Sequence, residues 1–158
     1  MLLSYRLPRE PSAPRVAVWR RLKRLGVAQV SDGLVTLPAD ARTREQLEWV
    51  ADEVVEHGGT SSVWLARPTT SAHERELAAA LAADRAAEYA GLEAAARRAL
   101  GEEPAEQQRT LTRVRRLNRE ITRRDFFPPP ERDAARVAIR ELEERVSAHS
   151  EPALRRAP

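Results

Sequence analysis

The chain has 158 residues, which is enough for one domain or for a small domain with an appendage, and it carries a net charge of +3. It has no cysteine, so disulfide bonds and thiolate metal ligands are excluded. No apolar segment is long enough for a signal peptide or a membrane span, so a soluble, cytoplasmic protein without membrane contact is expected.

The first 68 residues mix short apolar runs with two amphipathic segments. Strands are expected over residues 2–7, 27–30, 34–37 and 60–66. A first helix is expected from residue 15 to 25, with Ser12 as its N-cap and Gly26 ending it. A second helix is expected from Thr43, as its cap, to His57, with Trp49 at the edge of its buried stripe.

A tight turn is predicted between the second and third strands. Asp32-Gly33 lies between two apolar runs, a pattern typical of a type I′ hairpin. The resulting order, β-α-β-β-α-β, favours an α+β fold of the ferredoxin-like kind, with four antiparallel strands and both helices on one face. The other face of such a sheet needs a cover, which the rest of the chain could supply.

The remainder of the chain is rich in Ala, Leu, Arg and Glu and predicts about three helices. These span residues 72–100, 109–124 and 131–147, with residues 102–108 as a polar linker and Val137 among the apolar contacts of the last helix. We therefore expect a ferredoxin-like domain over residues 1–68, a helical region over 72–148 packed on it, and a flexible tail over 149–158.

Arginine clusters are the main candidate for chemistry, because Lys23 is the only lysine among 27 basic residues. An uncompensated row of guanidinium groups suits phosphate or another oxyanion. The alternative is a solvated face whose charges are neutralised by Glu and Asp elsewhere. The candidate DNA-binding residues lie on the first helix and on the helix over 109–124: Arg20, Arg21, Lys23, Arg24, Arg115, Arg116, Arg119 and Arg123.

A second candidate is an oxyanion site at Arg85, Tyr89 and Arg116. Arg85 and Glu88 interrupt an apolar helix stripe, and a charge in that position must be paired or lie at an edge. Arg85 therefore either faces a ligand, with Tyr89 nearby, or forms a structural pair with Glu88.

Enzyme signatures are not recognised: the sequence has no phosphate-binding glycine loop, no nucleophile elbow and no metal-binding His pair. No cofactor, metal ligand or catalytic residue is predicted. Asp32 could bind a metal in a dimeric nuclease, but a turn residue needs no such role. Trp19, Trp49 and Trp64 could stack on nucleic-acid bases, and core or interface anchoring is the plainer alternative.

Several fragments together resemble the N-terminal region of the chromate-resistance regulator ChrB. They are Arg15-Val16-Ala17-Val18-Trp19-Arg20-Arg21-Leu22-Lys23-Arg24-Leu25-Gly26, Asp32-Gly33-Leu34-Val35-Thr36-Leu37-Pro38, Thr43-Arg44-Glu45-Gln46-Leu47-Glu48-Trp49, Asp84-Arg85-Ala86-Ala87-Glu88-Tyr89, Arg115-Arg116-Leu117 and Asp125-Phe126-Phe127-Pro128. The first domain is also similar to the central domain of PaaX-type repressors.

This resemblance implies a chromate-responsive transcriptional regulator. Neither the C-terminal domain common in ChrB proteins nor the winged helix of PaaX repressors is recognised in the chain. DNA contact would therefore come from the arginine-rich helices. Three alternatives remain open: a regulator binding DNA or chromate, with a homodimer as its candidate assembly; an oxyanion-sensing or interaction module that partners a ChrB C-terminal domain protein; and a metal-dependent nuclease.

Overall fold

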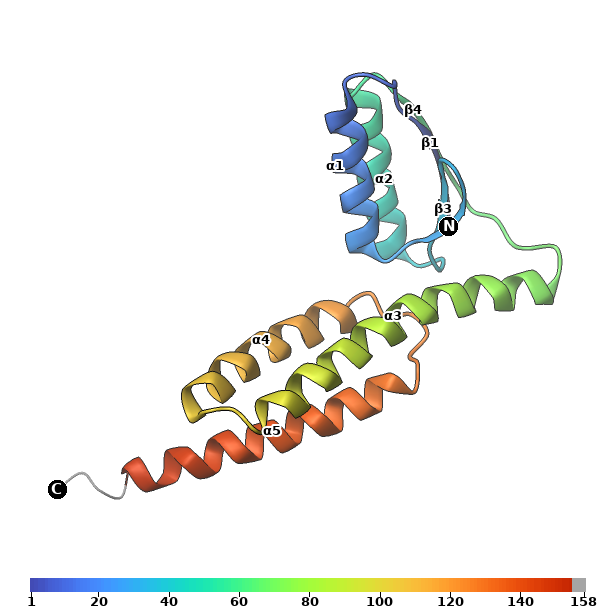
Figure 1. The fold of residues 1–158 in the computed structure, drawn as a ribbon. Helices are drawn as coiled ribbons and strands as arrows, with labels where there is room; N and C mark the ends of the chain where they lie inside the picture. Colours follow the sequence, from blue (N-terminus) through green and yellow to red (C-terminus); the bar gives the residue numbers. More distant parts are fainter. Residues whose placement is uncertain (155–158) are drawn as a thin grey trace. The chain divides into compact units, whose positions relative to one another are not determined.

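The chain forms two compact units, seen in a computed structural model that describes residues 1–154, with side chains as far as His149. The first unit comprises Met1–Leu81 and the second Ala82–Pro158 (Figure 1). No helix among the described residues is long and apolar enough to cross a membrane.

The first unit is a four-stranded antiparallel sheet with two helices on one face (Figure 1). Hydrogen bonding sets the strand order as β2-β3-β1-β4. Alternation places Leu3 of β1 and Val35 of β3 on the helix side, where both are buried. The elements are β1 (Leu2–Arg6), α1 (Ser12–Leu25), β2 (Ala28–Ser31), β3 (Leu34–Thr36), α2 (Ala41–Glu56) and β4 (Thr60–Trp64).

Both helices of this unit turn an apolar stripe toward the sheet. Val18 and Leu22 of α1 are fully buried, as are Leu47, Val50 and Val54 of α2. Along each helix these buried residues are spaced three or four positions apart, as expected for one face of an α-helix. Trp49 does not belong to the stripe, because it is 53% exposed.

The predicted helix starts were wrong in detail. Pro11 is the N-cap of α1 and Ser12 is already helical. The N-cap of α2 is Asp40 rather than Thr43. The Asp40 side chain accepts a hydrogen bond from the Thr43 amide at 2.7 Å, and the Thr43 hydroxyl accepts one from the Asp40 amide at 3.1 Å. The two residues form a reciprocal capping box, in which Asp40 is the N-cap and Thr43, the expected cap, is the third helical residue.

The β2–β3 hairpin is confirmed, but its turn is not type I′. That turn needs positive φ at both central residues, whereas Gly33 has φ 69° and no non-glycine residue of the described chain has a positive φ. The Gly33 carbonyl accepts a 2.7 Å hydrogen bond from the Tyr5 amide. A Cβ on Gly33 would lie 2.4 Å from the Tyr5 carbonyl oxygen, so the close approach of β1 requires glycine here.

The second unit is a helical core formed by α4 (Pro104–Thr122), α5 (Glu131–Leu154) and most of α3 (Ser71–Ala99). Its buried cluster includes Tyr89 and Leu92 of α3, Val114 of α4 and Leu142 of α5. Val137 lies outside this core, at 47% exposure, and the inward positions of α5 are instead Ala135, Ala138, Ile139 and Leu142.

Two boundaries of this unit differ from expectation. Residues 104–108, predicted as linker, are the first turns of α4. Buried Gln107 donates hydrogen bonds to the carbonyls of Leu100 and Glu102, so it satisfies backbone groups where α3 ends. Helix α5 continues to Leu154 instead of stopping at 147, and residues 155–158 of the predicted tail lie outside the described residues.

The α+β class with a helical C-terminal part is therefore confirmed. The ferredoxin-like assignment of the first unit stays a prediction. So does the packing of residues 72–148 on the open sheet face.

Candidate functional site

The basic face of α1 is only partly neutralised. Arg21 donates a 2.6 Å hydrogen bond to Glu53 of α2. The Lys23 ammonium lies 4.8 Å from the centroid of the Trp19 ring, in a cation–π contact. Arg20 and Arg24 are exposed, are four residues apart, and form no ion pair within the described residues. Two of the four predicted cations on this helix can therefore reach a partner.

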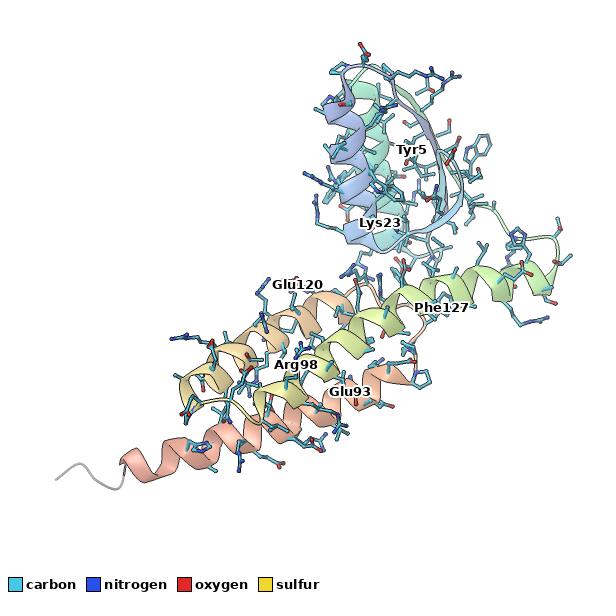
Figure 2. All side chains as sticks on the ribbon, in the orientation of Figure 1. Tyr5, Lys23, Glu93, Arg98, Glu120 and Phe127 are labelled. Atoms are coloured by element: carbon cyan, nitrogen blue, oxygen red, sulfur yellow. The ribbon has the colours of Figure 1, made fainter. Side chains whose placement is uncertain are left out.

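Helix α4 shows the same division. Arg115 donates a 2.7 Å hydrogen bond to Glu143 of α5. Arg116 pairs with Glu120 one turn later at 3.0 Å, and Figure 2 labels Glu120 on this helix. Arg119 and Arg123 are exposed and have no carboxylate within ion-pair distance in the described part of the chain. They lie one turn apart, so their guanidinium groups leave the helix in similar directions.

A buried ion-pair cluster lies inside the second unit. Arg85 of α3 is 4% exposed. Its Nε lies 2.9 Å from Glu88 Oε2, and the other oxygen of Glu88 lies 2.9 Å from the Nη2 atom of Arg124. Asp84 is more distant, at 3.9 Å from Arg85. One carboxylate thus bridges a guanidinium group of α3 and one from the turn that follows α4, and the contacts of Arg85 are ion pairs without good hydrogen-bond geometry.

The Tyr89 hydroxyl forms the other half of this cluster. It donates a 3.0 Å hydrogen bond to Asp125 and lies 3.4 Å from the Thr122 hydroxyl. The Asp125 side chain is 1% exposed, and Arg132 Nη1 lies 3.8 Å from its Oδ2. Burial raises the pKa of Tyr89, and its hydrogen bond to Asp125 raises it further, against the opposing effect of Thr122.

The predicted oxyanion residues are thus only partly brought together. Arg85 and Tyr89 lie one turn apart on α3 and both are buried, but each is already held by a carboxylate. Arg116 is exposed on α4, and no recorded contact among the described residues joins it to either of them. The structural alternative, a pair between Arg85 and Glu88, is what is observed.

Sequence reasoning missed Arg124, Asp125 and Arg132 as members of this cluster. Asp125 was visible as part of a helix-ending Asp-Phe-Phe-Pro fragment, and the fold brings that fragment to the Tyr89 hydroxyl. Arg132 stands in the first turn of α5, where no local pattern distinguishes it from the other arginines.

A groove opens beside the cluster on the α3–α4 side. Its volume is about 330 Å³, and apolar Leu92 and Leu117 form part of its floor. Glu88 and Arg124 line the same groove, so the bridged carboxylate can be reached from outside. The exposed fractions of their side chains, 31% and 22%, agree with this access.

The remaining candidates occupy the first unit. Asp32 lies in the hairpin turn, 3.5 Å from Gln29 Nε2. Trp19 is half-buried, whereas Trp64 is 59% exposed, so Trp64 does not anchor the core of this unit. No group of three or more potential metal-ligating side chains occurs among the described residues.

Comparison with known protein families shows to which family the chain belongs. A family model described as "Protein ChrB, N-terminal" matches residues 15–102, which is more than half of the chain. The chain belongs to the ChrB family. No curated protein and no solved structure matches it.

The ChrB match begins in α1 and ends just after α3, so it crosses the boundary between the two units. Arg20, Arg24, Arg85 and Tyr89 all lie within it. Arg119 and Arg123 of α4 lie beyond it, as do the Asp125 and Arg132 partners of the buried cluster. The family match therefore does not include the exposed arginines of the α4 region.

Proposed function

We propose that this ChrB-family chain is a chromate-responsive transcriptional regulator that holds DNA phosphates with Arg119 of α4 and Arg123, the C-cap of that helix. Arg20 and Arg24 of α1 form a second phosphate-binding surface. The observation that carries the proposal is the pair of exposed guanidinium groups at the end of α4, which have no carboxylate partner among the described residues, in a protein that pairs many of its other arginines.

The physical argument is one of cost. Like charges one helical turn apart destabilise a helix by a few tenths of a kcal/mol, about as much as an opposite pair stabilises it. Arg115 and Arg116 on the same helix avoid that cost through Glu143 and Glu120. Phosphate oxygens would neutralise Arg119 and Arg123 in the same way, and guanidinium groups bind two oxygens at once.

The test is the salt dependence of DNA binding by the full chain. We expect binding to DNA from upstream of its own coding sequence to weaken steeply with salt. The double variant Arg119→Gln/Arg123→Gln should lower the slope of log K against log salt by about 2, because each lost phosphate contact removes about one unit. Fluorescence anisotropy over a salt series measures this slope.

A matched control removes two charges elsewhere. Arg140→Gln/Arg145→Gln on α5 changes net charge equally at exposed residues and should leave the slope near that of the parent chain. If both double variants lower the salt slope equally, the loss reflects net charge and not specific phosphate contacts of Arg119 and Arg123. If the chain binds no DNA, the proposal is wrong, and the interaction module that partners a ChrB C-terminal domain protein becomes the better hypothesis.

We propose further that the chromate-responsive element is the carboxylate bridge of Arg85, Glu88 and Arg124. A doubly charged tetrahedral oxyanion carries the same kind of acceptor oxygens as Glu88 and more charge, so it can take the place of that carboxylate between the two guanidinium groups. The bridge is accessible from the groove and includes Arg124, which directly follows Arg123 in the chain. Homodimer formation remains a separate prediction.

A further inference from the structure

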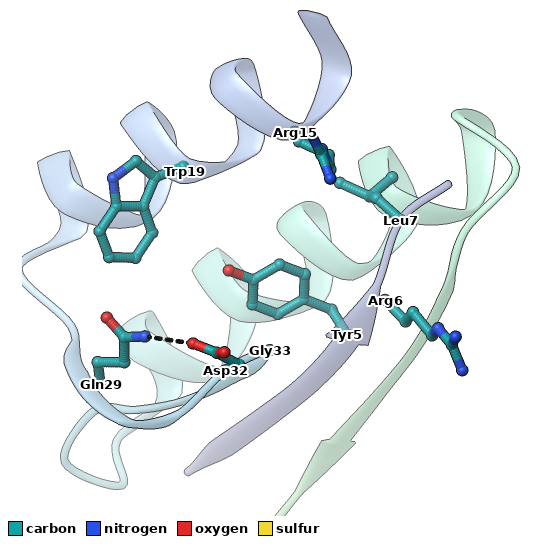
Figure 3. Close-up of a pocket in the computed structure, with 8 residues that line it drawn as sticks. All are labelled: Tyr5, Arg6, Leu7, Arg15, Trp19, Gln29, Asp32 and Gly33. Carbon is teal, nitrogen blue, oxygen red and sulfur yellow. Dashed lines mark hydrogen bonds between the residues drawn. The ribbon is translucent and has the colours of Figure 1, made fainter. Parts of the chain in front are cut away.

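A second cavity lies in the first unit, between α1 and the β2–β3 hairpin (Figure 3). Its volume is about 560 Å³, which falls in the range of small-molecule sites. Two half-buried aromatic rings, Trp19 of α1 and Tyr5 of β1, face into it (Figure 3). Arg15, one turn before Trp19, stands at one side, and Gln29 and Asp32 stand at the other.

The polar side of the cavity has an ordered pattern of donors and acceptors. Gln29 Nε2 lies 3.5 Å from Asp32 Oδ1, as the dashed line in Figure 3 marks, so the amide nitrogen stands directly beside the carboxylate. The amide NH₂ has two hydrogens, and one of them remains for a ligand. Read along this edge, the protein offers one donor followed by two carboxylate acceptors.

The charges of the cavity are uncompensated. Neither Arg15 nor Asp32 forms an ion pair within the described part of the chain. Burial, with an added effect of the Asp32 carboxylate, raises the pKa of Tyr5, so its hydroxyl remains a donor at neutral pH. A matching ligand is flat, has N–H donors at one edge, and carries an anionic group that reaches Arg15.

We infer that this cavity binds a purine mononucleotide through its guanine edge. Guanine presents an acceptor oxygen followed by two N–H donors, which complements the donor of Gln29 and the two acceptors of Asp32. The ring stacks against Trp19 or Tyr5, and such stacking contributes about 1–3 kcal/mol per base. Arg15 binds the phosphate.

The same geometry selects against adenine. Its pairing edge presents an unprotonated ring nitrogen, which would face the Asp32 carboxylate lone pair to lone pair. Although Asp32 is exposed, a carboxylate oxygen and a ring nitrogen that face one another each give up a hydrogen bond to water without gaining one. We therefore expect guanosine monophosphate to bind at least tenfold more tightly than adenosine monophosphate.

Equilibrium dialysis of the full chain against the monophosphates tests the assignment. Asp32→Asn should weaken guanosine monophosphate binding at least tenfold and allow xanthosine monophosphate to bind, because asparagine offers one acceptor and one donor to the N–H and carbonyl of xanthine. Asparagine has the same shape as aspartate and is common in turns, so the fold should survive. Asp52→Asn, an exposed carboxylate of α2, is the matched control and should change nothing.

A second arm tests the phosphate contact. Arg15→Gln should weaken guanosine monophosphate while leaving unphosphorylated guanosine unchanged. The Arg119→Gln/Arg123→Gln variant should bind the nucleotide normally, so this site and the proposed DNA surface can fail independently. The inference is overturned if no saturable binding occurs up to millimolar nucleotide, if adenine and guanine nucleotides bind equally, or if Asp32→Asn leaves the preference unaltered.

Discussion

At the scale of single residues, the hydrogen bond from Tyr89 to Asp125 ties two distant parts of the second unit together. Tyr89 is fully buried and the Asp125 side chain is nearly so, yet one Asp125 oxygen has no hydrogen-bond partner in the described part of the chain. The Tyr89 hydroxyl therefore provides one of few polar contacts that offset the desolvation of this carboxylate.

Tyr89→Phe should cost about 1.5–3 kcal/mol of unfolding free energy, because it removes a hydrogen bond to a charged, buried acceptor. Since the pKa of Tyr89 is raised in the fold, its protonated form is favoured there, and its contribution is constant below pH 10 and falls as pH rises above the unfolded-state pKa. Urea titrations at neutral pH and above pH 10 measure both effects.

Tyr5→Phe serves as the control, since the Tyr5 hydroxyl forms no recorded hydrogen bond among the described residues. It should change the unfolding free energy little. A loss as large in Tyr5→Phe as in Tyr89→Phe would show that the Asp125 contact is not the cause.

Residue-level prediction from the sequence succeeded where a pattern was local. The charge of Arg85 on an apolar stripe correctly required a partner, and the sequence offered Glu88 at three-residue spacing. Arg124 contacts Glu88, more than thirty residues earlier, and Arg132 contacts Asp125, seven residues earlier. No periodic pattern in the sequence indicates either contact. Which arginines are neutralised across helices, as Arg115 is by Glu143, depends on helix packing that the sequence does not display.

At the scale of elements, the start of α2 is fixed by side chains. Thr43 is fully buried, and its hydroxyl also donates a 2.6 Å hydrogen bond to the Pro38 carbonyl. The capping box and this bond together set where the chain leaves β3 and enters the helix. They also hold the β3–α2 connection on which the register of Leu47 and Val50 depends.

Asp40→Ala should destabilise the first unit by about 1 kcal/mol, because it leaves the Thr43 amide without its acceptor. Asp52→Ala removes an exposed carboxylate from the same helix and should have a much smaller effect. Thermal unfolding followed by circular dichroism compares the two. Equal shifts in both variants would contradict the capping role and point to helix charge instead.

Every strand and helix was present in the sequence as a periodic segment, and the differences lie at the ends. Helix α4 begins earlier than expected, because Pro104 occupies a first-turn position, where proline is tolerated. Helix α5 continues to Leu154, past its expected end at residue 147. End positions depend on caps and tertiary contacts more than on the apolar stripe.

At the scale of the whole molecule, three features coexist in a ChrB-family chain. Exposed arginines on α1 and at the end of α4 are the proposed phosphate-binding surfaces, a half-buried carboxylate bridges two guanidinium groups in the second unit, and an aromatic cavity lies in the first unit. The family match spans parts of both units, through the continuous helix α3. An effector in one site and DNA at another would be linked by a coupling free energy.

Chromate should weaken DNA binding by the parent chain, and DNA should weaken chromate binding by the same factor, because coupling between two binding equilibria is reciprocal. Glu88→Gln removes the carboxylate that competes for Arg85 and Arg124, so half-maximal release of DNA should need less chromate. Arg124→Gln removes one guanidinium group, so half-maximal release of DNA should need more chromate.

Anisotropy titrations with chromate, and with sulfate to separate general ionic effects, measure these midpoints. Glu93→Gln, which breaks only the exposed pair with Arg97, is the matched control. If Glu88→Gln and Glu93→Gln shift the chromate midpoint alike, the carboxylate bridge is not where chromate acts. Opposite shifts for Glu88→Gln and Arg124→Gln would instead place chromate between the guanidinium groups of Arg85 and Arg124.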